Sequence, residues 1–251
     1  TRLNSSAASD VYKRQDADID AAVAGVLFSA FVASGQTCVA GSRIIVHESI
    51  YDTFAKKLAQ RADQIQLGDP MDESTQMGPV ICRTSLDRCK QFIETARTEG
   101  GQQISGLEPL QLDNEFAKGF YLRPTIFTDV KIDHTLFLEE VFGPVISLTR
   151  VSNDAEAIAC ANAGDFGLGV SIWSRDIGRA HRLSKTIRGG VIWLNDHHRN
   201  DPRSVWGGVK DSGFGKENGW DALRAYLTKK SIIIRTKEGY DDWFKDGQRY
   251  G

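Results

Sequence analysis

A cysteine lies in a short polar segment directly after an apolar, helix-like stretch. In FVASGQTCVAGSR, Cys38 is preceded by Gly35, Gln36 and Thr37 and followed by Val39. A thiol attacks a carbonyl only as its thiolate, and the pKa of an unperturbed cysteine is roughly 8.5. A nearby base or backbone N–H donors must therefore help, and the N–H of Cys38 itself is a candidate oxyanion donor. This segment alone leaves both a reactive and a structural cysteine open.

Two acidic residues precede an aromatic residue and a Gly-Pro turn in EEVFGPV. One carboxylate on a loop, Glu139 or Glu140, could bind the two hydroxyls of a sugar through short hydrogen bonds. The ring of Phe142 could pack against a planar heterocycle. The alternative is a solvated acidic pair before a turn.

A glycine-rich segment, WGGVKDSGFGKE, begins at Trp206. Its glycines permit close approach of the backbone, but it lacks the spacing of a phosphate-binding loop. The nearby pair His197 and His198 suggests a metal site, yet adjacent side chains point in different directions on a helix or a strand. We therefore expect a polar loop that lines a pocket, and no metal.

Composition excludes several functional classes. The chain has 251 residues, of which 41% are hydrophobic and 25% are charged, with a net charge of -2. This balance provides no basic surface for nucleic acid or anionic lipid. No apolar run is long enough to span a bilayer. The four cysteines, Cys38, Cys82, Cys89 and Cys160, show neither disulfide-rich density nor paired metal spacing, which indicates a cytoplasmic protein with reduced thiols.

Periodic patterns predict helices that alternate with strands, which is typical of an α/β domain with a largely parallel sheet. The expected helices cover Asp16 or Asp18 to Ser34, Ile50 to Gln66, Thr84 to Gly100, Asp154 to Asn162, Ile177 to Ile187 and Trp220 to Tyr226. The expected strands cover Ser42 to His47, Val145 to Val151, Gly169 to Trp173, Gly190 to Leu194 and Ser231 to Arg235, with Lys118 to Val130 extended. The apolar terminal strand could pair with another chain or within its own subunit.

The first fifteen residues show no apolar period and no signal-peptide pattern. Within them, DVYKRQ, from Asp10 to Gln15, looks like a translated sequencing adapter. We therefore expect residues 1–15 to be a non-native or disordered leader outside the fold.

Five collinear motifs resemble those of the aldehyde dehydrogenase superfamily, over about Asp16 to Arg235. They are FxxxGQxC, EEVFGPV, GFYLRPT, ANAGDFGLGVSIWSRD and WGGVKDSGFGKENG. The resemblance implies an aldehyde dehydrogenase-like catalytic domain at 16–224, an oligomerisation strand at 225–235 and a C-terminal tail at 236–251. It also implies a homo-oligomer, dimer or tetramer, for the full-length protein.

The resemblance assigns roles to individual residues. Cys38 would attack the aldehyde to give a thiohemiacetal, hydride would pass to NAD or NADP, and water would hydrolyse the thioester to a carboxylate. Glu140 and Phe142 would bind the nicotinamide end of the cofactor, and Arg88 would approach its adenine-side ribose. The implied substrate-pocket residues are Thr37, Val39, Asn195 and Trp206, the last in place of the family's common Phe.

Two departures from the family pattern stand out. Ala33 occupies a position where the family commonly has Asn. The family's dinucleotide-binding half, with its general-base glutamate and oxyanion asparagine, has no counterpart in this sequence. We therefore interpret the chain as a C-terminal fragment, mostly without the dinucleotide-binding domain, and expect it to be inactive alone.

Two alternatives remain open at this point. One is an aldehyde dehydrogenase that passes its acyl group to coenzyme A. The other is a non-enzymatic structural or binding relative of the same fold. The identity of the aldehyde, and the choice between NAD and NADP, are not readable from these residues.

Overall fold

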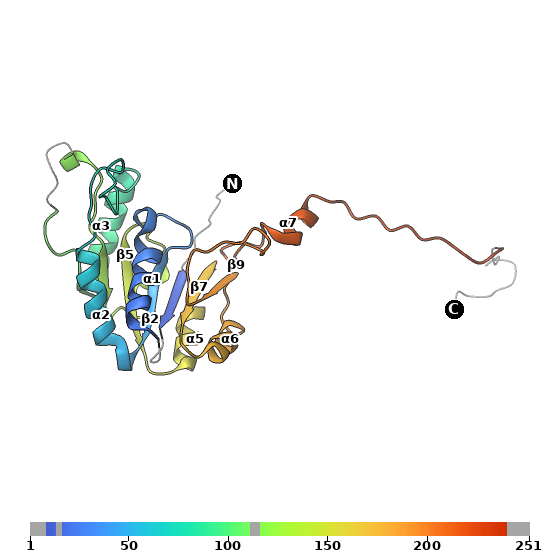
Figure 1. Cartoon of the computed structure of the whole chain (residues 1–251), viewed down its shortest axis with the longest axis horizontal. Coiled ribbons are helices and arrows are strands. Elements are labelled where there is room, and N and C mark those ends of the chain that lie inside the picture. Colours follow the sequence, from blue (N-terminus) through green and yellow to red (C-terminus); the bar gives the residue numbers. More distant parts are fainter. Residues whose placement is uncertain (1–8, 14–16, 111–115, 240–251) are drawn as a thin grey trace.

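A seven-stranded sheet forms the centre of the molecule (Figure 1). The computed structural model describes residues 9–13, 17–110 and 116–239. The strands lie in the order β3 (Gln102–Gln103), β4 (Thr125–Thr128), β5 (Val145–Val151), β2 (Gly41–His47), β1 (Ser9–Lys13), β7 (Gly169–Trp173) and β8 (Val191–Leu194). Every neighbouring pair is parallel except β3 and β4. The predicted α/β class with a largely parallel sheet is confirmed.

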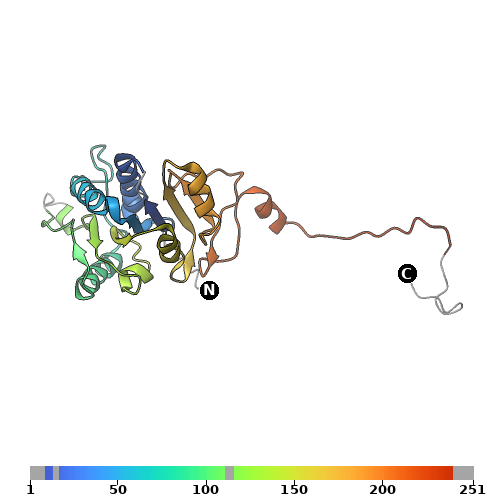
Figure 2. The same ribbon diagram turned by 90° about the horizontal axis from the view of Figure 1, so that it is seen from below.

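Helices cover both faces of this sheet. They are α1 (Ile19–Phe31), α2 (Glu48–Asp63), α3 (Arg83–Thr98), α4 (Thr135–Leu138), α5 (Asp154–Asn162) and α6 (Ile177–Ser184). Helix α7 (Gly219–Ala225) lies away from the sheet and has no buried residue (Figure 1). Figure 2 shows α1 and α2 on one face and α3 on the other. Two short strands, β6 (Phe166–Gly167) and β9 (Val209–Lys210), form a separate antiparallel pair.

Strand β2 explains why the sheet is covered on both sides. Its residues Ile44 and Val46 belong to the apolar cluster that includes α1 and α2, whereas Ile45 belongs to the cluster that includes α3, α5 and α6. Successive side chains of a strand point to opposite faces, so a continuous apolar run requires two cores. Both cores are present.

Local capping determines where the first two helices begin. Asp18 is the N-cap of α1, because its Oδ1 accepts hydrogen bonds from the N–H groups of Asp20 and Ala21, each at 3.1 Å. His47 is the N-cap of α2, and its Nδ1 accepts from the N–H of Ser49 at 3.2 Å. Helix α2 therefore begins two residues before the predicted Ile50. The alternative cap, Asp16, lies outside the described residues.

The N-terminal segment differs from its prediction. Ser9–Lys13, expected outside the fold, form strand β1 between β2 and β7, and pair in parallel with both. Asp10 is in register with Arg43 of β2 and with Val170 of β7. Backbone hydrogen bonds on both edges hold a segment whose composition carries no strand pattern. The expectation that the whole leader lies outside the domain is therefore wrong for these five residues.

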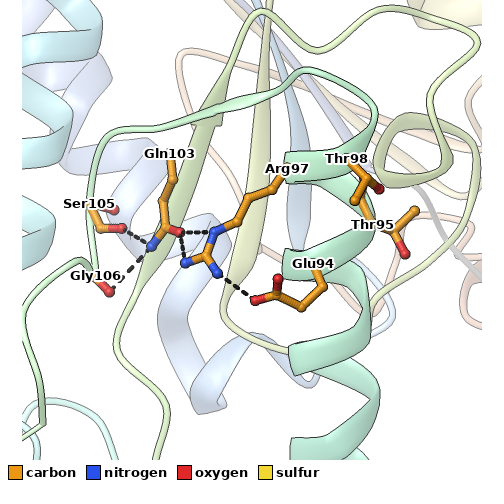
Figure 3. A network of polar contacts seen from close by, with 7 residues as sticks. All are labelled: Glu94, Thr95, Arg97, Thr98, Gln103, Ser105 and Gly106. Atoms are coloured by element: carbon orange, nitrogen blue, oxygen red, sulfur yellow. Dashed lines mark hydrogen bonds and ion pairs between the residues drawn. The ribbon is translucent and has the colours of Figure 1, made fainter.

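A polar network fixes the antiparallel edge of the sheet (Figure 3). Arg97, on α3, donates from Nη2 to Oε1 of Gln103 in β3 at 2.6 Å and also pairs with Glu94. The amide of Gln103 donates to the carbonyl oxygen of Ser105 at 2.8 Å and to that of Gly106 at 3.2 Å. These contacts tie the last turn of α3 to the edge strand.

The segment after α7 runs away from the sheet as an extended arm (Figure 1). Ile232, Ile233 and Ile234 are 77%, 95% and 76% exposed, respectively. Among the described residues no strand is formed between Ser231 and Arg235, where the sequence predicted one. In the same part of the chain, no helix has the length and apolar character needed to cross a membrane.

Candidate active site

The segment that carries Cys38 leaves α1 through a left-handed turn. Ala33, Ser34 and Gly35 have φ angles of 51°, 56° and 70°, respectively. The hydroxyl of Ser34 donates to the carbonyl oxygen of Gly78 at 2.9 Å, which holds the turn against a distant loop. The chain then reaches Cys38 and enters β2 at Gly41.

The cysteine segment and the acidic segment touch through their backbones. A Cβ atom on Gly35 would lie only 2.5 Å from the carbonyl oxygen of Gly143. A Cβ atom on Gly143 would in turn lie 2.3 Å from Sγ of Cys89. Real Cβ contacts are not this short, so glycine is required at both positions. The two predicted site segments therefore lie side by side.

A small cavity opens between these two segments. Its lining combines both of them with residues of α1, β2 and β5: Ala30, Gly35, Thr37, Ala40, Ser42, Glu140, Phe142, Gly143 and Ile146. Three residues predicted separately as site residues, Thr37, Glu140 and Phe142, thus share one cavity.

The acidic loop is supported from α3. Arg88 donates from Nε to the carbonyl oxygen of Val141 at 3.2 Å and from Nη2 to that of Glu140. Its guanidinium also lies 5.1 Å from the ring centre of Phe92. Phe142 has a φ angle of 57° and a side chain that is 42% exposed. The structure thus places Arg88 under the loop as its support, and a cofactor contact of Arg88 stays a prediction.

The thiol of Cys38 is partly buried, and its surroundings favour the protonated form. Burial raises the pKa of Cys38 most. The N–H groups of Cys38 and Val39 act in the opposite direction, while the negative charges of Glu140 and Glu217 raise the pKa further. A base must therefore remove the proton before Cys38 can act as a nucleophile at neutral pH.

Trp206 lies beside the cysteine. Cys38 and Trp206 both pack against an apolar cluster of Val39, Leu168 and Trp193. The rings of Trp193 and Trp206 have centres 6.0 Å apart and meet edge to face. The structure therefore brings the predicted pocket residues Val39 and Trp206 together with the predicted nucleophile.

Glu217 is a charged neighbour of Cys38 that the sequence motifs did not single out. Backbone hydrogen bonds of 2.7 Å run in both directions between Trp206 and Glu217. This bridge closes the glycine-rich segment into a loop and brings the carboxylate into the electrostatic surroundings of the thiol. The one sequence feature that could have pointed to Glu217 is its place in WGGVKDSGFGKENG, one of the five motifs that resemble the family.

Asn195 fastens the ends of two strands. Its Oδ1 accepts from the N–H of Ser174 at 2.9 Å, and its Nδ2 donates to the carbonyl oxygen of Ser174 at 2.9 Å. This two-way contact joins the residue after β7 to the residue after β8. The amide of Asn195 is therefore engaged with backbone, and its predicted role in the substrate pocket stays a prediction.

The adjacent histidines both contact the cysteine segment. Nε2 of His197 lies 2.7 Å from the carbonyl oxygen of Val39, and Nε2 of His198 lies 3.4 Å from Oγ1 of Thr37. Burial lowers the pKa of His198, which favours the neutral ring. Among the residues that the structure describes, no group of three or more His, Cys, Asp or Glu side chains is arranged to hold a metal ion.

Comparison with known proteins identifies relatives over most of the chain. A model of the aldehyde dehydrogenase family matches residues 3–232. A betaine aldehyde dehydrogenase from Brucella anthropi is 39% identical over 219 residues, which are 87% of this chain and 45% of the relative. The chain thus spans less than half the length of this curated relative.

Solved structures agree with this result. A point mutant of apo betaine aldehyde dehydrogenase from Staphylococcus aureus, with a BME-modified cysteine, superposes with a TM-score of 0.90 at 34% identity. The match covers 96% of this chain and 48% of that one. An NAD+ complex of aldehyde dehydrogenase from Bacillus cereus gives a TM-score of 0.86 at 33% identity, over 92% and 46% of the two chains.

Proposed function

Because this chain belongs to the aldehyde dehydrogenase family, we propose that it carries the nucleophile of an NAD(P)-dependent enzyme that oxidises an aldehyde to a carboxylate. The observation that carries the proposal is the backbone contact between Gly35 and Gly143. It brings the loop of Cys38 and the loop of Glu140 and Phe142 together around one cavity.

Cys38 supplies the covalent step. Its Sγ attacks the aldehyde carbon, and the carbonyl oxygen becomes an oxyanion that the N–H of Cys38 can stabilise. The partly exposed ring of Trp206, which packs against the buried Val39 and Trp193, holds the aldehyde's organic part near the thiol. The raised pKa of Cys38 means that its proton must leave before or during attack. The nearest charged groups, Glu140 and Glu217, make the thiolate less stable and thus more reactive once formed.

The acidic loop fits the sugar and ring of a nicotinamide nucleotide. Glu140 offers a carboxylate to ribose hydroxyls, and the exposed ring of Phe142 offers an aromatic face to a planar ring. Arg88 holds the backbone of this loop through two carbonyl groups. When bound, the nucleotide supplies the hydride acceptor. The solved NAD+ complex of the Bacillus cereus relative supports this choice of cofactor.

The nucleophile can be tested on the 251-residue chain itself. Brief treatment with p-nitrophenyl acetate should place one acetyl group per chain on Cys38, measured by peptide mass spectrometry. Cys38→Ala should abolish this labelling, and Cys82→Ala, which removes another partly exposed thiol, should leave it unchanged. Hydrogen bonding to Ser85 lowers the pKa of Cys82, so that thiol can also be acetylated and labelling is scored on the Cys38 peptide alone. Absence of an acetyl group from that peptide would argue for the non-enzymatic alternative.

The reaction requires the longer protein that contains this segment. We expect NADH or NADPH formation with an aldehyde and a free carboxylate as product, and no turnover by the 251-residue chain alone. Betaine aldehyde and a neutral aromatic aldehyde are informative substrates, because the partly exposed ring of Trp206 can pack against either a quaternary ammonium group or a ring. An acyl-CoA product that forms only with coenzyme A would favour the acyl-transfer alternative.

The exposed arm supports a proposal about assembly. Within the predicted oligomerisation strand, 225–235, three consecutive isoleucines, Ile232, Ile233 and Ile234, are exposed on an extended arm (Figure 1). We infer that this arm adds to a sheet of a second copy in the full-length protein. Replacing Ile233 with Lys should lower the molar mass measured by light scattering, and an unchanged mass would contradict the proposal.

A further inference from the structure

The loop after β8 is rigidly held where it passes the cysteine. Asn195 fastens its start to Ser174. Oδ1 of Asp196 accepts from the N–H of His197 at 2.8 Å. Further along, the indole N–H of Trp193 donates to the carbonyl oxygen of Arg199 at 2.7 Å. These contacts leave the ring of His197, 4% exposed, with a defined position.

The ring of His197 bridges two backbone elements. Its Nε2 lies 2.7 Å from the carbonyl oxygen of Val39, and its Nδ1 is hydrogen-bonded to the hydroxyl of Ser171 in β7. A carbonyl oxygen can only accept, so Nε2 carries a proton. In the neutral ring Nδ1 then accepts from Ser171, which assigns the tautomer. His197 therefore connects β7 to the residue directly after the nucleophile.

We propose that His197 is a positioning residue for Cys38. By holding the carbonyl of Val39, it fixes the backbone of residues 38 and 39, whose N–H groups stabilise the thiolate. The same constraint keeps the N–H of Cys38 in place for the oxyanion. His198 restrains the other side of the nucleophile through Thr37. This proposal rests on the proposed function only in taking Cys38 as the nucleophile.

The expected effect follows from the loss of one buried hydrogen bond. Without the bond to Val39, the two N–H groups are no longer held toward Sγ, and a smaller fraction of Cys38 is thiolate at a given pH. Such a bond is worth about a two- to tenfold change in an equilibrium. Alkylation of Cys38 by iodoacetamide at pH 7.5 should therefore slow about two- to tenfold in His197→Phe, which retains a ring.

The pH profile separates positioning from a general structural effect. In His197→Phe the profile of Cys38 alkylation should shift to higher pH, while the plateau rate at high pH stays close to that of the wild type. His197→Gln retains an N–H donor for Val39 and should restore part of the rate. Ser171→Ala, which removes only the hydroxyl partner of Nδ1, should give a smaller shift in the same direction. His181→Gln, on the exposed face of α6, is the matched control and should change nothing.

The ratio of Cys38 to Cys82 alkylation within each chain corrects for differences in folding. An unshifted profile in His197→Phe, or an equal change at both cysteines, would overturn the proposal. The measurement needs neither aldehyde nor cofactor. The alkylation profile can therefore show the predicted shift even if the longer protein does not oxidise aldehydes. Alkylation tests the role of His197, and aldehyde oxidation tests the proposed function.

Discussion

The contact between Gly35 and Gly143 can be tested by adding one methyl group. Gly35→Ala places a Cβ atom 2.5 Å from the carbonyl oxygen of Gly143 and 3.0 Å from that of Ala30. Both neighbours are backbone atoms, so neither can move aside by a rotamer change. Gly35 also has a φ angle of 70°, a conformation that L side chains disfavour.

Two costs combine in this substitution. The left-handed conformation costs an alanine roughly 1 to 2 kcal/mol, and overpacking against fixed atoms costs roughly 1 to 3 kcal/mol. Replacing glycine also lowers the conformational entropy of the unfolded chain, which offsets about 0.4 to 1 kcal/mol of this loss in stability. We therefore expect Gly35→Ala to lower the free energy of unfolding by roughly 1 to 4.5 kcal/mol, of which roughly 1 to 3 kcal/mol comes from the overpacking.

Gly164→Ala is the matched control. Gly164 has a φ angle of 76°, but its Cβ would meet only the Nη1 atom of Arg43 at an ordinary 3.5 Å. It should cost about 1 kcal/mol, the conformational part alone. Urea unfolding followed by tryptophan fluorescence at pH 7.5 measures both variants. If the two losses agree within about 0.5 kcal/mol, the close contact between the two site loops is not present and the reasoning fails.

Three further predictions concern the same region. Ala33→Asn should raise the free energy of unfolding by about 0.5 to 1 kcal/mol, since Ala33 is exposed with a φ angle of 51° and Asn tolerates this conformation; urea unfolding would show an unchanged or lower value if this is incorrect. Glu140→Gln should speed alkylation of Cys38 near pH 8, because the carboxylate raises the pKa of that thiol; slower alkylation would contradict the assignment. Burial raises the pKa of Cys89 from about 9 in the unfolded chain to about 11 in the folded protein. The difference in proton binding contributes roughly 2 to 3 kcal/mol to the free energy of unfolding. This contribution is fully present below pH 9 and is lost as the pH rises to about 11. Cys89→Ala should show a smaller decline in unfolding free energy over that range, and an equal decline would exclude Cys89 as its cause.

The segment around Cys38 drew attention because a cysteine lies among small and polar residues directly after a predicted helix. That local pattern left a structural cysteine open, and only the five collinear motifs favoured a nucleophile. The family assignment that followed from the five motifs is confirmed. The roles of Cys38, Glu140 and Phe142 stay predictions, now with a geometry that brings their segments together.

The residues that hold the site loops in place could not be predicted from the sequence. His197 was interpreted only as part of a polar pocket loop, because its partner Val39 lies 158 residues away. The cofactor contact expected of Arg88 stays a prediction, but nothing in the sequence indicated that Arg88 also holds the backbone of Glu140 and Val141, more than 50 residues further along. Contacts with backbone carbonyl groups leave no pattern in side-chain types, so sequence periodicity does not reveal them.

The sequence by itself determined most of the helices and apolar strands, since each depends on periodicity or capping within about fifteen residues. It named Cys38 as the candidate nucleophile only through five motifs spread along the chain. Only the tertiary structure showed that Ser9–Lys13 form a strand inside the sheet and that Gly35 packs against the backbone of Gly143. Both depend on backbone groups from distant segments. Strands β2 and β7 offer backbone hydrogen-bonding groups on both sides of β1, so a segment without an apolar strand pattern can lie between them. Glycine becomes necessary at Gly35 and Gly143 only because their two loops come into contact.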